Sequence, residues 1–119
     1  MISNSTQSES SARQPMDSLR KSADAACRLM KALANRDRLL LLCQLVQGEM
    51  CVGDLEVTVG VGQPTLSQQL GVLREEGLVT TRREGKNIYY QVSSPQVLAV
   101  LAVLHQQFCQ QPGVVPTGI

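Results

Sequence analysis

The sequence lacks a long apolar run and a secretory start. Its longest uninterrupted apolar stretch, residues 97–104, covers eight residues, whereas roughly 20 are needed to span a bilayer as a helix. No cationic N-terminus followed by an apolar segment is present, so we expect no signal peptide. These absences predict a soluble, cytoplasmic protein with no membrane partner.

The chain also lacks most of what an enzyme active site needs. It holds one histidine, His105, and has no CxxC motif and no glycine-rich phosphate loop. No nucleophile is accompanied by a plausible His–acid pair. We therefore expect neither enzymatic activity nor a cofactor.

Positive charge is scarce, and its placement matters more than its amount. The formal net charge of +1 favours no particular partner. After residue 60 the only cations are Arg74, Arg82, Arg83 and Lys86, and three of these four fall within five positions. A local patch of this kind can contact phosphate without a basic isoelectric point.

The length and the local composition predict one folded domain between two tails. At 119 residues the chain has the length of a single domain. Residues 1–15 are rich in Ser, Gln and Asn, which predicts a disordered tail. We expect the domain to cover residues 16–111 and a flexible tail to cover residues 112–119.

The apolar periodicity predicts four helices before a β-hairpin and one helix after it. Asn35 can cap the second helix, Gly77 closes the fourth, and Pro95 opens the last. The expected helices begin at residue 17 or 18 and end near 34, then cover 37–47, 52–59, about 64–76, and 95–110. Strands are expected at 78–83 and 87–92.

The fourth predicted helix has a polar face beside the basic hairpin. Leu66, Leu70 and Leu73 recur at helical spacing and face the core, which turns the polar residues outward. Small hydrogen-bonding groups suit base edges, and cations suit phosphates. The predicted contacts with double-stranded DNA are Gln63, Thr65, Ser67, Gln68, Gln69, Arg82, Arg83 and Lys86.

This element order predicts a mainly α (α+β) fold, a winged helix-turn-helix with a two-stranded β-wing. The last helix is apolar around most of its circumference near Leu101, which favours burial between two subunits over burial in one. A helical homodimer would present two reading helices to a palindromic operator. A protein-interaction module without DNA binding would fit the last helix but would leave the polar face of residues 64–69 unexplained.

Residues 29–45, 52–55 and 62–79, together with the Tyr pair at 89–90, resemble the ArsR/SmtB family of small winged-helix repressors. The resemblance covers about residues 20–110. It is closest to the persulfide-responsive subgroup that includes the biofilm growth-associated repressor, whose members regulate sulfide-oxidation genes.

The resemblance also implies a role for two of the four cysteines. Cysteines of a cytoplasmic protein are thiols by default, so a disulfide would be regulatory. The subgroup carries one cysteine in a setting like that of Cys43 and one in a setting like that of Cys109. The resemblance therefore implies a redox switch in which reactive sulfur species join these two residues by a disulfide or polysulfide bridge and release operator DNA.

A metal- or metalloid-responsive repressor is the alternative. Metal-sensing members of the family carry a Cys-Val-Cys-Asp-Leu box, but residues 51–55 read Cys-Val-Gly-Asp-Leu, with Gly53 in place of the second thiol. One thiolate cannot hold a soft ion alone, so we assign no metal site. The alternative stays open because three of the thiols Cys27, Cys43, Cys51 and Cys109 could form an unfamiliar site. The sequence gives no role to Cys27, Cys51 or His105.

Overall fold

A computed structural model describes residues 15–109. The chain divides into two compact units, with the boundary between Lys31 and Ala32. Within the described residues, the first unit is most of helix α2 (Met16–Leu33), which carries an ion pair between Asp17 and Arg20 near its start. The predicted disordered tail and the predicted C-terminal tail at 112–119 lie outside the described residues, apart from Pro15.

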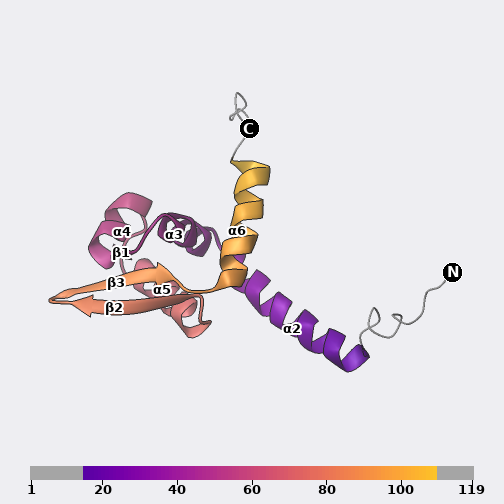
Figure 1. Ribbon diagram of the computed structural model, residues 1–119. Helices are drawn as coiled ribbons and strands as arrows, with labels where there is room; N and C mark the ends of the chain where they lie inside the picture. Colours follow the sequence, from indigo (N-terminus) through magenta and orange to yellow (C-terminus); the bar gives the residue numbers. More distant parts are fainter. Residues whose placement is uncertain (1–14, 110–119) are drawn as a thin grey trace. The chain divides into compact units, whose positions relative to one another are not determined.

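The second unit contains four helices and a small antiparallel sheet (Figure 1). The strand order is β1-β3-β2. The elements are α3 (Arg36–Val46), β1 (Met50–Cys51), α4 (Val52–Val59), α5 (Thr65–Glu75), β2 (Val79–Glu84), β3 (Asn87–Val92) and α6 (Pro95–Phe108).

Local sequence explains where these elements begin and end. The side chain of Asn35 accepts a hydrogen bond from the backbone N–H of Arg38 at 3.0 Å, which caps α3 as predicted. Ser94 caps α6 by accepting from the backbone N–H of Val97 at 3.2 Å. Gly60 ends α4 in the left-handed conformation, with φ of +78°, a region that favours glycine. The turn that follows α4 therefore begins at a glycine, the residue that adopts this conformation most readily.

The core is built mainly from leucines of consecutive helices. Leu41, Leu42 and Leu45 of α3 are buried with Leu55 of α4. From α5, β2 and α6 the core receives Leu66, Leu70, Leu73, Val79, Val97 and Leu101. Truncating one such leucine to alanine costs about 2–5 kcal/mol of stability. This core holds α5 and the β2–β3 hairpin, hereafter the wing, in one unit.

The predicted winged helix-turn-helix is confirmed, and the sheet has one strand more than the sequence indicates. Strand β1 pairs with β3 through Met50 opposite Tyr90 and Cys51 opposite Tyr89. Two residues are too few to show an alternating pattern. Within residues 15–109, no helix is long and apolar enough to cross a membrane.

Candidate functional site

Helix α5 presents the polar face that the sequence predicts. Its three leucines, Leu66, Leu70 and Leu73, are buried, while Ser67 and Gln68 are exposed. The helix packs against α3 and β2. Two further predicted contact residues, Thr65 and Gln69, are half-buried on the same helix.

Gln63 and Ser67 hold each other at the start of α5. The side-chain oxygen of Gln63 accepts from the backbone N–H of Ser67 at 3.1 Å and from its hydroxyl at 2.7 Å. The backbone N–H groups of the first helical turn have no partner within the helix, so Gln63 satisfies one of them. Because the hydroxyl of Ser67 donates to Gln63, its oxygen can only accept from any other group.

Gln69 is hydrogen-bonded to helix α3. Arg38 of α3 donates from Nη1 to the Oε1 of Gln69 at 2.8 Å. In contrast, the side chain of Gln68 makes no hydrogen bond to any residue in the described part of the chain. The amide of Gln68 is therefore open to an outside partner on both its donor and its acceptor side.

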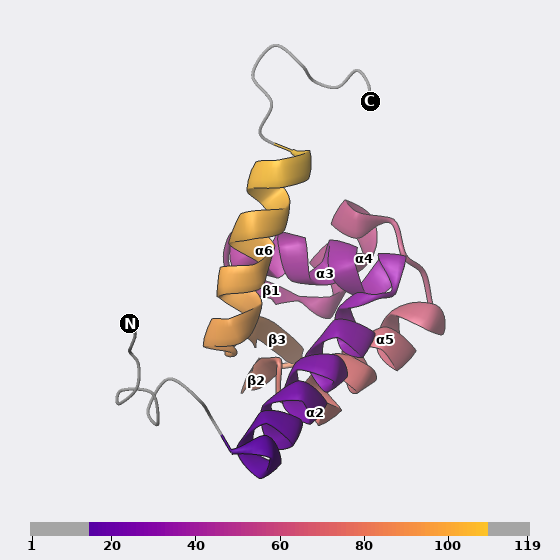
Figure 2. The ribbon, with the colours of Figure 1, turned by 90° about the vertical axis from the view of Figure 1, so that its right-hand side faces the viewer.

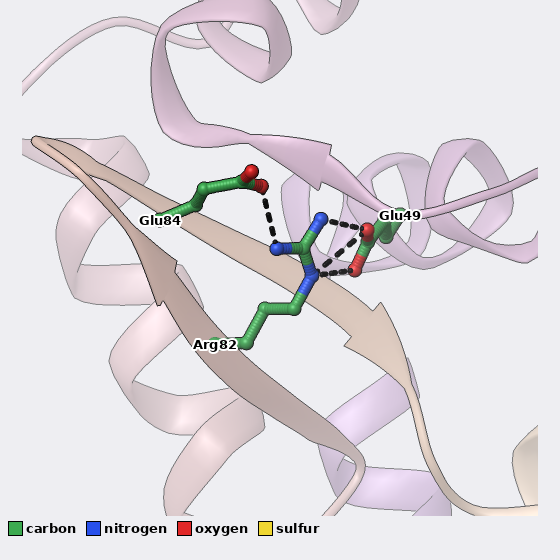
Figure 3. A network of polar contacts seen from close by, with 3 residues as sticks. All are labelled: Glu49, Arg82 and Glu84. Atoms are coloured by element: carbon green, nitrogen blue, oxygen red, sulfur yellow. Dashed lines mark hydrogen bonds and ion pairs between the residues drawn. The ribbon is translucent and has the colours of Figure 1, made fainter.

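The wing carries one paired cation and two unpaired ones. Arg82 binds Glu49 and Glu84 (Figure 3): its Nε lies 3.0 Å from each carboxylate oxygen of Glu49, and its Nη1 lies 2.8 Å from Glu84. Its guanidinium also lies 4.5 Å from the ring centre of Tyr89. Arg83 and Lys86 are exposed and have no ion pair within residues 15–109.

The electrostatics of Arg82 follow from these contacts. Its hydrogen bond to Glu49 holds the pKa of that carboxyl below its ordinary range. The hydrogen bonds to Glu49 and Glu84 raise the pKa of Arg82. Two carboxylates already neutralise this cation, so Arg83 and Lys86 are better placed than Arg82 to meet phosphate. The DNA contact of Arg82 stays a prediction.

Cys43 and Cys109 lie on separate elements of the second unit and are both exposed free thiols. Cys43 lies in α3, and Cys109 caps the C-terminus of α6. The helices α3 and α6 lie side by side in both views of the ribbon (Figures 1 and 2). Both sulfurs can therefore meet a reagent from solvent.

Within these two thiols, hereafter the thiol pair, the charge of Cys109 acts on Cys43. Partial burial raises the pKa of the Cys43 thiol, and the negative charge of Cys109 raises it further. A charge acts in this way only over a short distance. Cys43 and Cys109, 66 positions apart in the sequence, are thus within electrostatic reach in the folded chain.

The other two cysteines lie elsewhere. Cys27 is exposed on α2, and Cys51 is half-buried in β1. Among residues 15–109, no group of three or more His, Cys, Asp or Glu side chains could hold a metal ion.

The surface of α6 corrects one expectation. Leu101, which the sequence places in the subunit seam, is only 5% exposed and belongs to the core of the chain. The apolar residues of α6 that do reach solvent are Leu98, Val103 and Phe108. The helix is apolar on both sides, so its sequence could not tell which side faces inward.

Comparisons with known proteins fit this arrangement. Residues 35–81 match the model of the arsR family of bacterial regulatory proteins. The biofilm growth-associated repressor of Xylella fastidiosa is 46% identical over 95 residues, which cover 80% of this chain and 83% of the relative. The chain belongs to the ArsR family.

Other relatives of this ArsR-family chain include an activator. The transcriptional activator HlyU of Vibrio cholerae is 40% identical over 80% of this chain and 88% of its own length. The crystal structure of the Xylella fastidiosa repressor matches with a TM-score of 0.75 at 45% identity, covering 82% of this chain and all of that one. The structure of reduced Vibrio cholerae HlyU also has a TM-score of 0.75, at 41% identity, covering 78% of this chain and 98% of that one.

These relatives are transcriptional regulators rather than enzymes. The ArsR-family chain is therefore a DNA-binding transcriptional regulator and not an enzyme. Two residues near its polar surfaces, Arg38 and Glu49, were not predicted from the sequence. Their partners lie 31 and 33 positions away in the sequence, and no local pattern connects them.

Proposed function

We propose that this regulator is a dimeric repressor whose operator affinity is switched by a bridge between Cys43 and Cys109. The observation that carries the proposal is the placement of the thiol pair: both sulfurs are exposed, and the charge of one raises the pKa of the other. Redox-sensor cysteines are accessible to solvent and often lie next to a second cysteine that resolves the first product. The similar Xylella fastidiosa protein is itself a repressor.

Operator reading is assigned to α5 and the wing. The polar face of α5 offers hydrogen-bonding groups of the kind that read base edges in the major groove. Arg83 and Lys86 extend from the adjacent wing and suit phosphates. The predicted contacts Gln63, Thr65, Ser67, Gln68 and Gln69 therefore form one surface with a cationic flank.

The dimer is assigned to α6. Leu98, Val103 and Phe108 leave an apolar strip on α6, with exposed fractions of 44%, 55% and 77%. A second copy of the same surface would remove this strip from water. Two-fold symmetry would then place two copies of α5 about 34–36 Å apart, one helical turn of DNA.

The switch requires an oxidant, and we assign this role to a polysulfide. A thiolate of the pair attacks a sulfane sulfur, which breaks the S–S bond of the polysulfide and releases a shorter one. The second thiolate attacks the Sγ of the first cysteine, breaks its bond to the added sulfur, forms the disulfide and releases that sulfur as HS⁻. If the first cysteine acquires two sulfurs, attack on the middle sulfur leaves a trisulfide and also releases HS⁻.

Bridge closure would reach the DNA surface through packed elements. The bridge draws the end of α6 toward α3, and α3 packs against α5. Because α6 also contributes to the dimer, its movement would change the spacing or tilt of the two copies of α5. The two copies of α5 would then no longer fit operator half-sites that lie one helical turn of DNA apart.

The test is a binding titration on DNA selected from a random library by the reduced protein. We expect a polysulfide to lower affinity and dithiothreitol to restore it. Cys43→Ser and Cys109→Ser should each bind like reduced wild type and stay bound in polysulfide, because one sulfur cannot close the bridge. Cys27→Ser and Cys51→Ser serve as matched controls and should respond normally.

Two results would redirect the proposal. Release by arsenite or zinc but not by polysulfide would favour a metal sensor that uses cysteine thiolates. Loss of the response in Cys51→Ser with retention in Cys109→Ser would move the responsive site to the start of α4.

A further inference from the structure

Arg38 is held in place from three sides. Its backbone N–H donates to the side chain of Asn35 at 3.0 Å, and its Nε donates to the backbone oxygen of Ala32 at 2.7 Å. The Ala32 carbonyl belongs to the last turn of α2, where carbonyls have no partner within the helix. The third contact is the hydrogen bond from Nη1 to Gln69 at 2.8 Å. The bond to Ala32 therefore anchors the guanidinium independently of Gln69.

This contact decides which way the amide of Gln69 faces. A guanidinium has donors and no acceptor, so only the oxygen of the amide can meet it. The usual ambiguity between amide oxygen and nitrogen is therefore settled by chemistry. The NH₂ group of Gln69 points away from Arg38 and is left to donate to another molecule.

We propose that Arg38 is a positioning residue that sets the base preference of Gln69. This inference rests on the proposed function of α5 as the reading helix. Held by Arg38, Gln69 acts toward DNA as a donor. Reading adenine in the bidentate manner requires the amide to donate to N7 and accept from N6 at once, and the contact with Arg38 directs the oxygen of Gln69 toward α3.

The expected preference follows from the groups on the major-groove edge. Guanine offers two adjacent acceptors, N7 and O6, whereas adenine places a donor beside its one acceptor. Gln69 therefore favours guanine over adenine at the base pair it faces. Gln68, whose amide has no such restraint, keeps both groups for a bidentate contact. The fold thus gives two neighbouring glutamines different specificities.

Selection from a randomised DNA library with the reduced protein tests this inference. We expect wild type to prefer guanine at the position facing Gln69, by about threefold to tenfold over adenine, the range of one hydrogen bond. Arg38→Ala frees the amide to rotate, so adenine should rise to near parity at that position while the other positions stay unchanged. Arg38→Lys, whose ammonium also only donates, should retain the guanine preference.

A second variant covers the case in which Arg38→Ala does not fold. Gln69→Glu keeps an acceptor for Arg38 and removes the outward donor. Its preference should move from guanine to cytosine, whose N4 amino group donates. A guanine preference that survives in Gln69→Glu overturns the inference.

Two variants that remove the glutamines separate failure of this inference from failure of the proposed function. If Gln68→Ala and Gln69→Met both leave the selected sequence unchanged, α5 is not the reading helix. If Gln69→Met changes one position but folded Arg38→Ala retains the full guanine preference there, α5 reads DNA and Arg38 does not position Gln69. A merely structural role for Arg38 would weaken binding to all sequences alike.

Discussion

Helix α5 and the thiol pair differ in how their polar groups are held. At α5, Gln63 binds Ser67 and Arg38 binds Gln69, so three of the five contact residues predicted in this segment have a fixed orientation. Cys43 and Cys109 are exposed free thiols. Preorganised groups favour selective binding because little ordering is left to do on association, and accessible thiols favour reaction. The arrangement of α5 therefore suits selective binding, and that of the thiol pair suits chemical reaction.

The two regions meet through α3. This helix carries Cys43, supplies Arg38 to α5, and packs against α5 directly. Under the proposed function, a bridge at one end of the unit therefore acts on the helix that supports the reading surface. The following predictions separate the contributions of the two regions.

The largest effect is expected from disrupting the proposed dimer. Val103→Glu places a charge in the exposed apolar strip of α6, where burial of an unpaired charge is costly. The protein should sediment as a monomer and lose about a hundredfold or more in operator affinity, since a half-site retains only part of the specific binding.

Val57→Glu is the matched control for the dimer test. Val57 is also exposed, at 84%, but lies on α4. It should leave the sedimentation coefficient unchanged. A Val103→Glu protein that sediments like wild type would remove α6 from the proposed interface.

The next effect concerns recognition by α5. Gln68→Ala removes an unrestrained amide and should cost roughly 1–3 kcal/mol of specific binding, with little loss on scrambled DNA. Fluorescence anisotropy with both DNAs measures the difference. Unchanged selectivity would mean that α5 is not the reading helix.

Smaller and less specific effects are expected from the wing. Arg83→Ala and Lys86→Ala should weaken binding to all sequences and lower the slope of log K against log salt by about 0.9 for each phosphate that is no longer neutralised. Arg82→Ala should change the slope less, because Glu49 and Glu84 already neutralise this cation. An equal change would show that Arg82 leaves its carboxylates for DNA.

The smallest effect is a shift in the pH dependence of one thiol. Burial and the charge of Cys109 raise the pKa of Cys43, so its reactive thiolate forms at higher pH than usual. The alkylation rate of Cys43, measured without Cys27 and Cys51, should rise toward a midpoint above the ordinary thiol range. Replacing Cys109 with serine removes one cause and should lower that midpoint without abolishing the effect of burial. An unchanged midpoint would place the sulfurs out of reach of each other.

Periodic patterns predicted the helices and the inward face of α5, because Leu66, Leu70 and Leu73 leave one helical arrangement that buries all three. Strand β1 was missed because it exists only through its pairing with β3. The position of Leu101 was misjudged because both sides of α6 are apolar. The contacts of Arg38 and Arg82 join distant parts of the chain, so they follow from tertiary packing and not from local sequence.

The central claim is tested most directly by mapping the bridge in protein released from operator DNA by a polysulfide. Remaining thiols are alkylated, and a glutamate-specific protease then cleaves after Glu49, which separates Cys43 from Cys51. The account predicts one linked pair of peptides containing Cys43 and Cys109. Because residues 10–49 also contain Cys27, its mass should be that of the two peptides with Cys27 alkylated, less two hydrogens, with or without whole added sulfur atoms. A link that contains Cys51, or released protein in which Cys43 is fully alkylated, would contradict it.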